Sequence, residues 1–253
     1  MQAFRSLILW ALVVSITAAF CSALLPWAVL GRRRFVFRAA RVWASLLLFI
    51  SGIRVVVEHP ERLMPPERRG GIQLANHQSF LDVVAFCYVL RTPVAYMAKS
   101  SLFRIPVFGQ VLKGLGCIPV DRSKRASSGR AMGAAVRAIQ SGHRVMVFPE
   151  GTRSRADGSL MPFKRGAFLL AKQSGAPLQA LSVSGAGRIM PAGQTGVRIQ
   201  RIFRGTIRIV VHPVMEAADI AALDADELRE SMFRQIDRPL DRLGVLAMLE
   251  TQE

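Results

Sequence analysis

His77 and Asp82 lie five residues apart in the segment Asn76-His-Gln-Ser-Phe-Leu-Asp82, directly after a short apolar run. An imidazole exchanges a proton near neutral pH, and a neighbouring carboxylate can fix its tautomer and stabilise the imidazolium that forms. The two side chains could therefore activate a hydroxyl group. The alternative interpretation is a surface histidine near the start of a helix, with Asp82 favourably placed for the helix dipole.

The geometry of a helix restricts how this pair can meet. Positions i and i+5 are about 140° apart around a regular helix, so both residues cannot share one helical face. His77 must therefore lie outside the helix and reach back over its first turn. Ser79 is a favourable N-cap residue, and it predicts a helix start that permits this contact.

Two further basic residues follow predicted strands. Lys99 lies between a strand and a helix with Pro106 in its first turn, where it is either a ligand-binding cation or an ordinary solvated lysine. Arg122 follows the strand-like run 117–120, and it either forms a structural ion pair with Asp121 or extends into a pocket to bind an anion. Ligand sites of α/β folds gather at the ends of strands, so both residues are candidates.

The segment Val147-Phe-Pro-Glu-Gly-Thr-Arg153 contains a second group of candidate residues. Gly151 permits a positive φ or a close approach to a ligand, whereas Thr152 and Arg153 can donate hydrogen bonds to a phosphate. Glu150 either orients Arg153 or binds a substrate hydroxyl. These residue types predict a site for a phosphate-bearing substrate.

The positive charge of the chain is concentrated before its C-terminal segment. The 253 residues carry a formal net charge of +17, and residues 216–253 hold ten acidic and four basic residues. Residues 1–215 therefore carry 30 basic and 7 acidic residues, a net charge of +23. Such a field suits nucleic acid, an anionic membrane surface or an acidic substrate. No nucleic-acid-binding motif accompanies the arginine clusters, so we expect membrane phosphate rather than nucleic acid.

The N-terminal part of the chain has the features of a membrane anchor. Residues 7–30 contain no charged side chain and are long enough to cross a hydrocarbon layer of roughly 30 Å as a helix. Three arginines at 32–34 follow, and then a second apolar stretch at 42–53. A cleaved signal peptide and two full spans are alternatives. We favour one span, or a shallow helical hairpin bent near Pro26, with the second stretch lying in the interface.

Charge and cysteine usage indicate which side of the membrane the rest of the chain occupies. Basic residues next to a span prefer the cytoplasmic side. Cys21, Cys87 and Cys117 have no metal-ligand spacing, and their odd number suits a reducing compartment. We therefore expect a membrane anchor over residues 1–53, one cytoplasmic domain over residues 54–253, and no metal site.

Short β-rich runs alternate with helical segments after the anchor, which predicts an α/β fold in one domain. We expect the C-terminal helix to pack its apolar face on this domain. The predicted strands are residues 54–57, 71–75, 94–97, 117–120, 144–148, 178–183 and 206–211. The predicted helices are residues 81–90, 106–115, 128–141, 165–174 and 226–243.

The segments NHQSFLD, GCIPVDR and FPEGTRSR, in this order and with AKSSLFRIPVFG and FKRGAFLLA, resemble the glycerolipid acyltransferase family. The chain is particularly similar to the bacterial 1-acylglycerol-3-phosphate acyltransferases over about residues 54–215, and NHQSFLD carries the HX4D motif. Ala180 is a departure, since the family commonly has the second of two prolines there. The resemblance implies a single mixed-sheet domain flanked by helices, with an N-terminal membrane-binding helical segment.

The resemblance also implies a reaction. His77, oriented by Asp82, would remove the proton from the free hydroxyl of 1-acylglycerol 3-phosphate. That hydroxyl would attack the thioester of an acyl carrier protein or acyl-CoA and give phosphatidic acid, with neither an acyl-enzyme nor a cofactor. The implied substrate-binding residues are Lys99, Arg122, Glu150, Gly151, Thr152 and Arg153.

Other acceptors and other roles stay open at this point. The acceptor could instead be a lyso-ornithine lipid, another lysophospholipid or glycerol 3-phosphate, and a non-catalytic protein that binds anionic lipids is the alternative to an enzyme. The expected partners are anionic membrane lipids, lysophosphatidic acid and an acyl carrier protein or acyl-CoA. The expected location is the bacterial inner membrane, with the catalytic domain on its cytoplasmic side.

Overall fold

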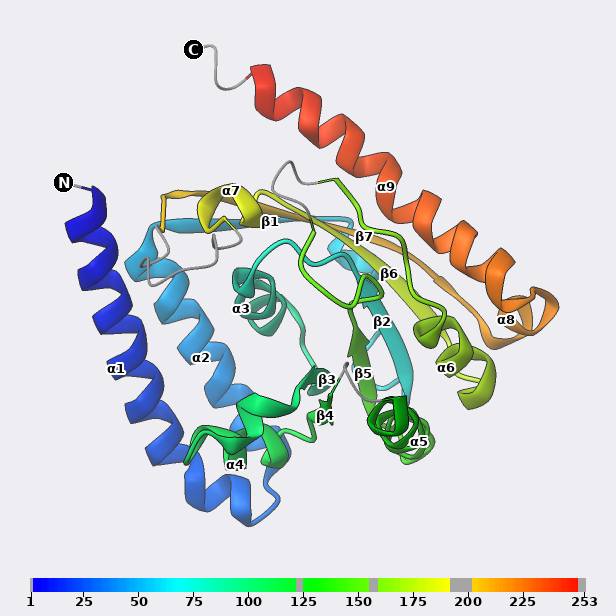
Figure 1. Ribbon diagram of the computed structural model, residues 1–253, viewed down its shortest axis with the longest axis horizontal. Helices are drawn as coiled ribbons and strands as arrows, with labels where there is room; N and C mark the ends of the chain where they lie inside the picture. The colour runs from blue at the N-terminus through cyan, green and yellow to red at the C-terminus, as the bar shows by residue number, and fades with distance from the viewer. Residues whose placement is uncertain (1, 122–124, 155–158, 192–201, 250–253) are drawn as a thin grey trace.

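The computed structural model describes residues 2–121, 125–154, 159–191 and 202–249 (Figure 1). Over these residues a seven-stranded sheet has the strand order β1-β7-β6-β2-β5-β3-β4. The β6–β7 pair is antiparallel and the other neighbouring pairs are parallel, so the sheet is mixed, as expected. The strands are β1 (Ile53–Glu58), β2 (Gly71–Ala75), β3 (Val94–Lys99), β4 (Ile118–Val120), β5 (Arg144–Val147), β6 (Leu178–Ser184) and β7 (Gly205–Met215).

Each predicted helix is present, and within the described ranges the structure adds two short α-helices and two 3₁₀ turns to them. The helices are α1 (Gln2–Val29), α2 (Arg33–Ser51), α3 (Phe80–Val89), α4 (Phe108–Gly114), α5 (Arg125–Gln140), α6 (Gly166–Ser174), α7 (Ala186–Ile189), α8 (Ala217–Ala222) and α9 (Ala225–Leu249). The 3₁₀ turns are η1 (Pro60–Arg62) and η2 (Ser100–Arg104).

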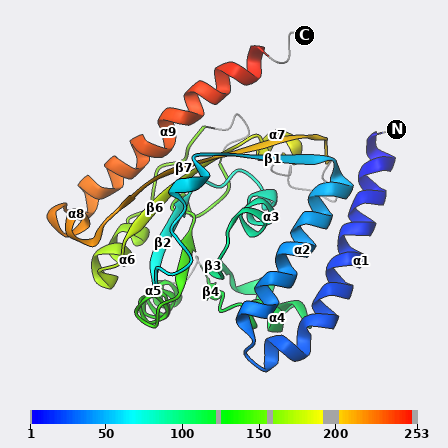
Figure 2. The ribbon, with the colours of Figure 1, turned by 180° about the vertical axis from the view of Figure 1, so that it is seen from behind.

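Helices cover both faces of the sheet (Figures 1 and 2). On one face, Phe86 of α3 and Phe37 of α2 share a buried core with Ala75 of β2. On the other face, α5, α6 and α9 share a second core with Ile72 and Leu74. Successive residues of a strand point to opposite faces, so β2 contributes to both cores and is buried throughout.

The topology brings two distant segments to one edge of the sheet. β2 and β5 are parallel neighbours, with Leu74 opposite Val147 near their carboxyl ends. Each strand is followed by one of the segments that carried candidate residues. Residues 76–79 and 148–154 therefore lie side by side, at the edge where ligand sites of α/β folds gather.

The two N-terminal helices form an antiparallel hairpin (Figure 1). Pro26 lies inside α1, and the chain reverses between the helices, where Gly31 takes a φ of 67° that glycine adopts readily. The expected bend near Pro26 is therefore displaced to this turn. Arg5 near the start of α1 donates hydrogen bonds to the carbonyl oxygen of Ser51 at 3.1 Å and to that of Ile202 at 3.4 Å, so α1 is held both on α2 and on the domain.

Much apolar surface of this hairpin is exposed. Within the part of the chain that the structure describes, α1 is the helix long and apolar enough to cross a membrane, by length and composition. α2 adds exposed apolar groups while its other side packs on α3. The large exposed apolar side chains of the hairpin are Phe4, Leu7, Ile8, Leu12, Val14, Trp27, Val29, Leu30, Phe35, Val42 and Phe49.

Candidate active site

His77 and Asp82 form the contact that their spacing predicted. His77 lies in the loop between β2 and α3, and its Nδ1 is 2.8 Å from Asp82 Oδ2. The same carboxylate oxygen accepts two backbone N–H groups, so it acts as an acceptor and Nδ1 carries the proton. The Nε2 of His77 has no hydrogen-bond partner within the described residues, which leaves it able to accept a proton.

The start of α3 holds Asp82 in place. Ser79 is the N-cap residue, and its side chain with that of Asp82 forms a capping box. Asp82 Oδ2 accepts the backbone N–H of Gln78 at 2.6 Å and that of Ser79 at 2.8 Å. The Asp82 side chain is fully buried. The carboxylate therefore both begins the helix and orients the histidine, and His77 lies outside the helix as expected.

The segment after β5 holds His77 from the other side. The imidazole stacks on the ring of Phe148, with centroids 4.2 Å apart and planes 18° from parallel. Glu150 Oε1 accepts the backbone N–H of His77 at 2.7 Å, and the carbonyl oxygen of His77 accepts the backbone N–H of Ser154 at 2.6 Å. The ring and both polar backbone groups of His77 are thus fixed by residues 148–154.

Glu150 occupies a different place from the one expected of a substrate ligand. Its side chain is buried, and Oε2 accepts hydrogen bonds from the backbone N–H of Met161 and from Ser154 Oγ, both at 2.9 Å. Burial raises the pKa of this carboxyl group, whereas the hydrogen bonds to it lower the pKa. Because its acceptor positions are filled by the protein, Glu150 supports the His77 loop instead of facing a ligand.

Arg153 lies beside the dyad. Its guanidinium carbon is 4.8 Å from the centre of the Phe80 ring, and Phe80 is the first residue of α3. A cation over an aromatic face is attracted by the ring quadrupole. The Nη1 atom of Arg153 is buried and has no hydrogen-bond partner in the described part of the chain. A donor of this kind, near a helix start, is suited to an anionic ligand.

Gly151 forms a sharp turn between Glu150 and Arg153. Its φ is +68°, a conformation that favours glycine. A Cβ atom at this position would lie 2.9 Å from Lys164 Nζ, so the lysine side chain crosses directly over the turn. Thr152 is exposed beside it. The turn thus carries a second cation that sequence reasoning did not include among the site residues.

One expected site residue is not joined to this cluster, and another lies outside the described residues. Lys99 is exposed at the end of β3, and no contact joins it to the dyad within the residues that the structure describes. Arg122 lies outside the described residues. Phe148 and Ser154, which hold His77, were missed from the sequence because a stacking ring and a buried hydroxyl carry no signature of spacing.

The cysteines offer no activated nucleophile near this cluster. Burial raises the pKa of the Cys87 thiol to about 12 and that of Cys117 to about 11, so both are protonated at neutral pH. The described residues contain no group of three or more His, Cys, Asp or Glu side chains that could hold a metal ion. An arrangement of this kind can act as a general base with an orienting carboxylate, beside a cation suited to an anionic ligand.

Known proteins share both the sequence pattern and the fold. A 1-acyl-sn-glycerol-3-phosphate acyltransferase of Arabidopsis thaliana is 30% identical over 235 residues, which cover 89% of this chain and 64% of the relative. An enzyme of the same name from Escherichia coli is 31% identical over 160 residues, 63% of this chain and 61% of the relative. The chain thus spans less than two thirds of the length of these relatives.

A solved structure shows the same architecture. The 1-acyl-sn-glycerophosphate acyltransferase of Thermotoga maritima superposes with a TM-score of 0.81 at 24% identity, and the match covers 96% of this chain and 98% of the other. The chain also matches the Acyltransferase family over residues 54–184, a stretch that contains the dyad, the residues around Glu150 and most of the sheet. Since this stretch is more than half of its length, the chain belongs to the Acyltransferase family.

Proposed function

We propose that this protein transfers a fatty acyl group from a thioester donor to the free hydroxyl of 1-acylglycerol 3-phosphate and so forms phosphatidic acid. The observation that carries the proposal is the 2.8 Å contact between His77 Nδ1 and Asp82 Oδ2, which leaves Nε2 available as a base. The unpaired Nη1 of Arg153 nearby supports an anionic acceptor. The names of the relatives support a glycerol phosphate as that acceptor.

In the proposed reaction the acceptor hydroxyl gives its proton to His77 Nε2 while its oxygen attacks the carbonyl carbon of the thioester. Asp82 stabilises the imidazolium through Nδ1, and general-base catalysis of this kind contributes about 10² to 10⁴-fold. The tetrahedral intermediate then collapses, the carbon–sulfur bond breaks, and the imidazolium returns the proton to the leaving sulfur. The products are the new ester and a free thiol, and no acyl-enzyme forms.

The phosphate of the acceptor binds at the turn after β5. Arg153 provides the main cation, held over Phe80 so that its guanidinium stays near the dyad. Gly151 permits the turn, and Thr152 adds a hydroxyl donor. Lys99 and Arg122 complete the proposed set of basic residues around the phosphate or the thioester oxygen.

Glu150 acts as a positioning residue. It accepts the backbone N–H of His77 and the backbone N–H of Met161, so it joins the loop of the base to the segment that follows the anion site. This role replaces the direct substrate contact expected from the sequence.

The membrane anchor is residues 1–53, and the acyltransferase domain is residues 54–253. α1 and α2 expose apolar side chains, and the turn between them exposes Arg32 and Arg34, which suits the boundary between lipid tails and anionic headgroups. Arg33 instead donates to the carbonyl oxygen of Leu115 at 2.7 Å. α2 packs on α3, so the anchor lies on the helix that carries Asp82. The enzyme would meet its lipid acceptor at the cytoplasmic face of a bacterial inner membrane, with acyl carrier protein or acyl-CoA as donor.

The test is acyl transfer by the purified, detergent-solubilised protein. Lysophosphatidic acid is incubated with acyl carrier protein or CoA thioesters, and products are identified by mass. We expect phosphatidic acid from the unaltered protein and none above background from His77→Ala, while both proteins bind anionic vesicles equally. Turnover retained by His77→Ala would remove the assignment of the base, and acylation of another lyso-lipid only would replace the acceptor.

A further inference from the structure

Lys164 is a basic residue beside the candidate active site to which the proposed reaction gives no role. Its backbone N–H donates to the carbonyl oxygen of Pro149 at 2.9 Å. Three residues earlier, the backbone N–H of Met161 donates to Glu150 Oε2, also at 2.9 Å. The chain before α6 is thus tied at two points to the turn after β5, and this fixes where the side chain of Lys164 begins.

The side chain of Lys164 crosses the turn at Gly151. A Cβ atom at Gly151 would lie 2.9 Å from both Cε and Nζ of the lysine, so the ammonium occupies space that glycine leaves free. The residues on either side of the lysine point elsewhere. Phe163 is buried in the core, and Arg165 pairs with Asp226 Oδ2 at 2.9 Å. Of these three consecutive residues, Lys164 is the one whose side chain reaches the turn.

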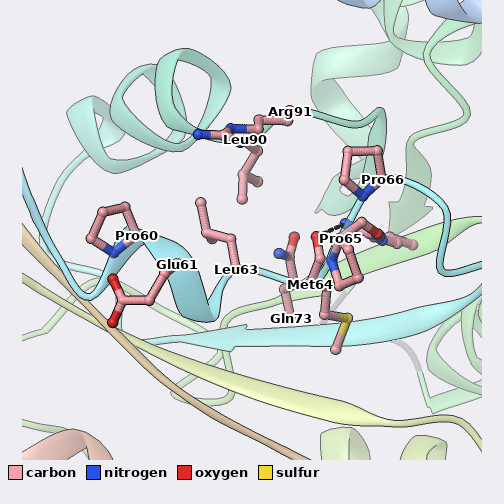
Figure 3. Close-up of a pocket in the computed structure, with 10 residues that line it drawn as sticks. Pro60, Glu61, Leu63, Met64, Pro65, Pro66, Gln73, Leu90 and Arg91 are labelled. Carbon is pink, nitrogen blue, oxygen red and sulfur yellow. Dashed lines mark hydrogen bonds between the residues drawn. The ribbon is translucent and has the colours of Figure 1, made fainter.

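Other basic side chains of the fold are committed to protein oxygens. Arg144 donates to the carbonyl oxygen of Met64 at 3.0 Å, one of four hydrogen bonds from this guanidinium, and Met64 lines the cavity at the end of α3 (Figure 3). Lys172 donates to three carbonyl oxygens, including that of Ala221 at 3.0 Å. Lys164 is exposed, and its ammonium has no hydrogen-bond or ion-pair partner in the described part of the chain. Its charge is therefore available to a ligand.

Lys164 and Arg153 place two positive charges at one turn. The buried Nη1 of Arg153 also lacks a partner among the described residues. Glu150 is the one acidic residue of the segment 147–154, and its carboxylate accepts from the backbone N–H of His77 and from Ser154. Two like charges on one turn repel each other, and an anion that binds both relieves this repulsion. The turn therefore suits an anion that carries more than one negative charge.

The charge of a phosphate group differs between classes of lyso-lipid. A phosphate monoester carries a charge of about −1.5 to −2 at pH 7, whereas a phosphodiester carries a single negative charge. We infer that Lys164 is a second phosphate-binding residue, which together with Arg153 selects a lyso-lipid with a phosphate monoester over one with a phosphodiester. The inference rests on the proposed function for the place of the phosphate, and it adds the residue that binds the second negative charge.

The test is calorimetric titration of the full-length, detergent-solubilised protein with two lipids and no acyl donor. The lipids are 1-acylglycerol 3-phosphate and its phosphomethyl ester, which differ by one methyl group and about one negative charge. We expect the unaltered protein to bind the monoester about tenfold more tightly than the diester. Lys164→Gln should weaken binding of the monoester by about tenfold and leave that of the diester nearly unchanged, so that the preference is lost.

Three further measurements separate this contact from other effects. Arg153→Ala should weaken binding of both lipids, because each keeps one negative charge for the guanidinium. Arg165→Gln is the matched control, since it removes the same charge from the next residue, whose guanidinium pairs with Asp226 instead. It should leave the preference unchanged. Lys164→Gln should unfold at the same temperature as the unaltered protein, because its side chain makes no described hydrogen bond.

The outcomes distinguish this inference from the proposed function. A preference for the monoester that persists in Lys164→Gln, or no preference in the unaltered protein, would overturn the role of Lys164. An equal loss in Arg165→Gln would also overturn it, because the general positive field would then select the monoester. Binding is measured without turnover. A failure of the unaltered protein to transfer acyl groups would remove the proposed reaction, whereas a lost preference in Lys164→Gln would still support the phosphate contact.

Discussion

The carboxylate of Glu150 accepts the backbone N–H of His77 at 2.7 Å, although 73 positions separate the two residues in the chain. The parallel pairing of β2 with β5 creates this contact, since both residues follow the carboxyl ends of their strands. The side chain of Glu150, which follows β5, thus fixes the backbone of the proposed base His77, which follows the neighbouring strand β2. Asp82 sets the direction of the imidazole, and Glu150 sets its location.

We expect Glu150→Gln to lower kcat with little change in the KM of the lipid acceptor. Glutamine has a single acceptor oxygen, so it cannot accept from His77, Met161 and Ser154 together, and its NH₂ group would oppose one of these donors. A displacement of about 1 Å at the base can cost about 100-fold in rate. Steady-state kinetics check this, with the surface variant Glu230→Gln as the matched control. A raised KM with unchanged kcat would show that Glu150 contacts the substrate.

Asp82→Asn should have a larger effect on rate. The asparagine amide can present an N–H to His77 Nδ1, which favours the tautomer that places the remaining proton on Nε2. We expect kcat to fall by about 10² to 10⁴-fold, the share of the barrier assigned to general-base catalysis. Ser79→Ala removes the N-cap hydroxyl, so it should cost about 1 kcal/mol of stability while kcat changes much less. Equal losses of kcat in the two variants would indicate that helix capping accounts for both.

The local geometry of the dyad could be predicted because both residues belong to one strand–turn–helix unit. Five residues of chain and a serine N-cap leave few ways for His77 and Asp82 to meet. The strands could be predicted for a similar reason, since they are short β-rich runs separated by helical segments. α7 and α8 were missed because helices of four and six residues carry too little periodicity to indicate them.

The support of the dyad could not be predicted. The contact between Glu150 and His77 depends on strand order, which local propensity does not encode, so Glu150 was interpreted as a substrate ligand. The predicted helix at 106–115 also begins two residues before α4 does. Val107 takes a φ of 64° and Phe108 donates to the carbonyl oxygen of Pro106 at 2.6 Å, so a tight turn occupies the predicted first turn.

Arg153→Ala should separate phosphate binding from the chemical step. We expect kcat/KM with lysophosphatidic acid to fall by about 10- to 100-fold, because a charged hydrogen bond to phosphate is lost. With 1-acylglycerol, which has no phosphate, the loss should be much smaller. The ratio of the two losses is the measurement, and Arg54→Ala is the control for a general loss of positive charge. Equal losses on both acceptors would mean that Arg153 does not bind the phosphate.

The stability of the fold should fall in mild acid because of His212, a buried residue of β7. Burial lowers its pKa to about 4, and its Nε2 is 2.8 Å from Ser182 Oγ, which itself donates to the carbonyl oxygen of Ile236. The folded state therefore resists protonation below the unfolded pKa of about 6.5. The neutral His212 therefore contributes its full share of the unfolding free energy above that pH. This contribution declines as the pH falls from about 6.5 toward 4.

Between pH 7 and pH 5 this linkage amounts to about 2 kcal/mol of unfolding free energy. Urea unfolding of the solubilised protein at the two pH values measures it. His212→Gln retains an N–H donor for Ser182 and cannot titrate. Its unfolding free energy should therefore fall by about 2 kcal/mol less between pH 7 and pH 5 than that of the unaltered protein. An unaltered pH dependence in His212→Gln would show that other groups destabilise the fold in acid, and that His212 is neutral or solvated in both states.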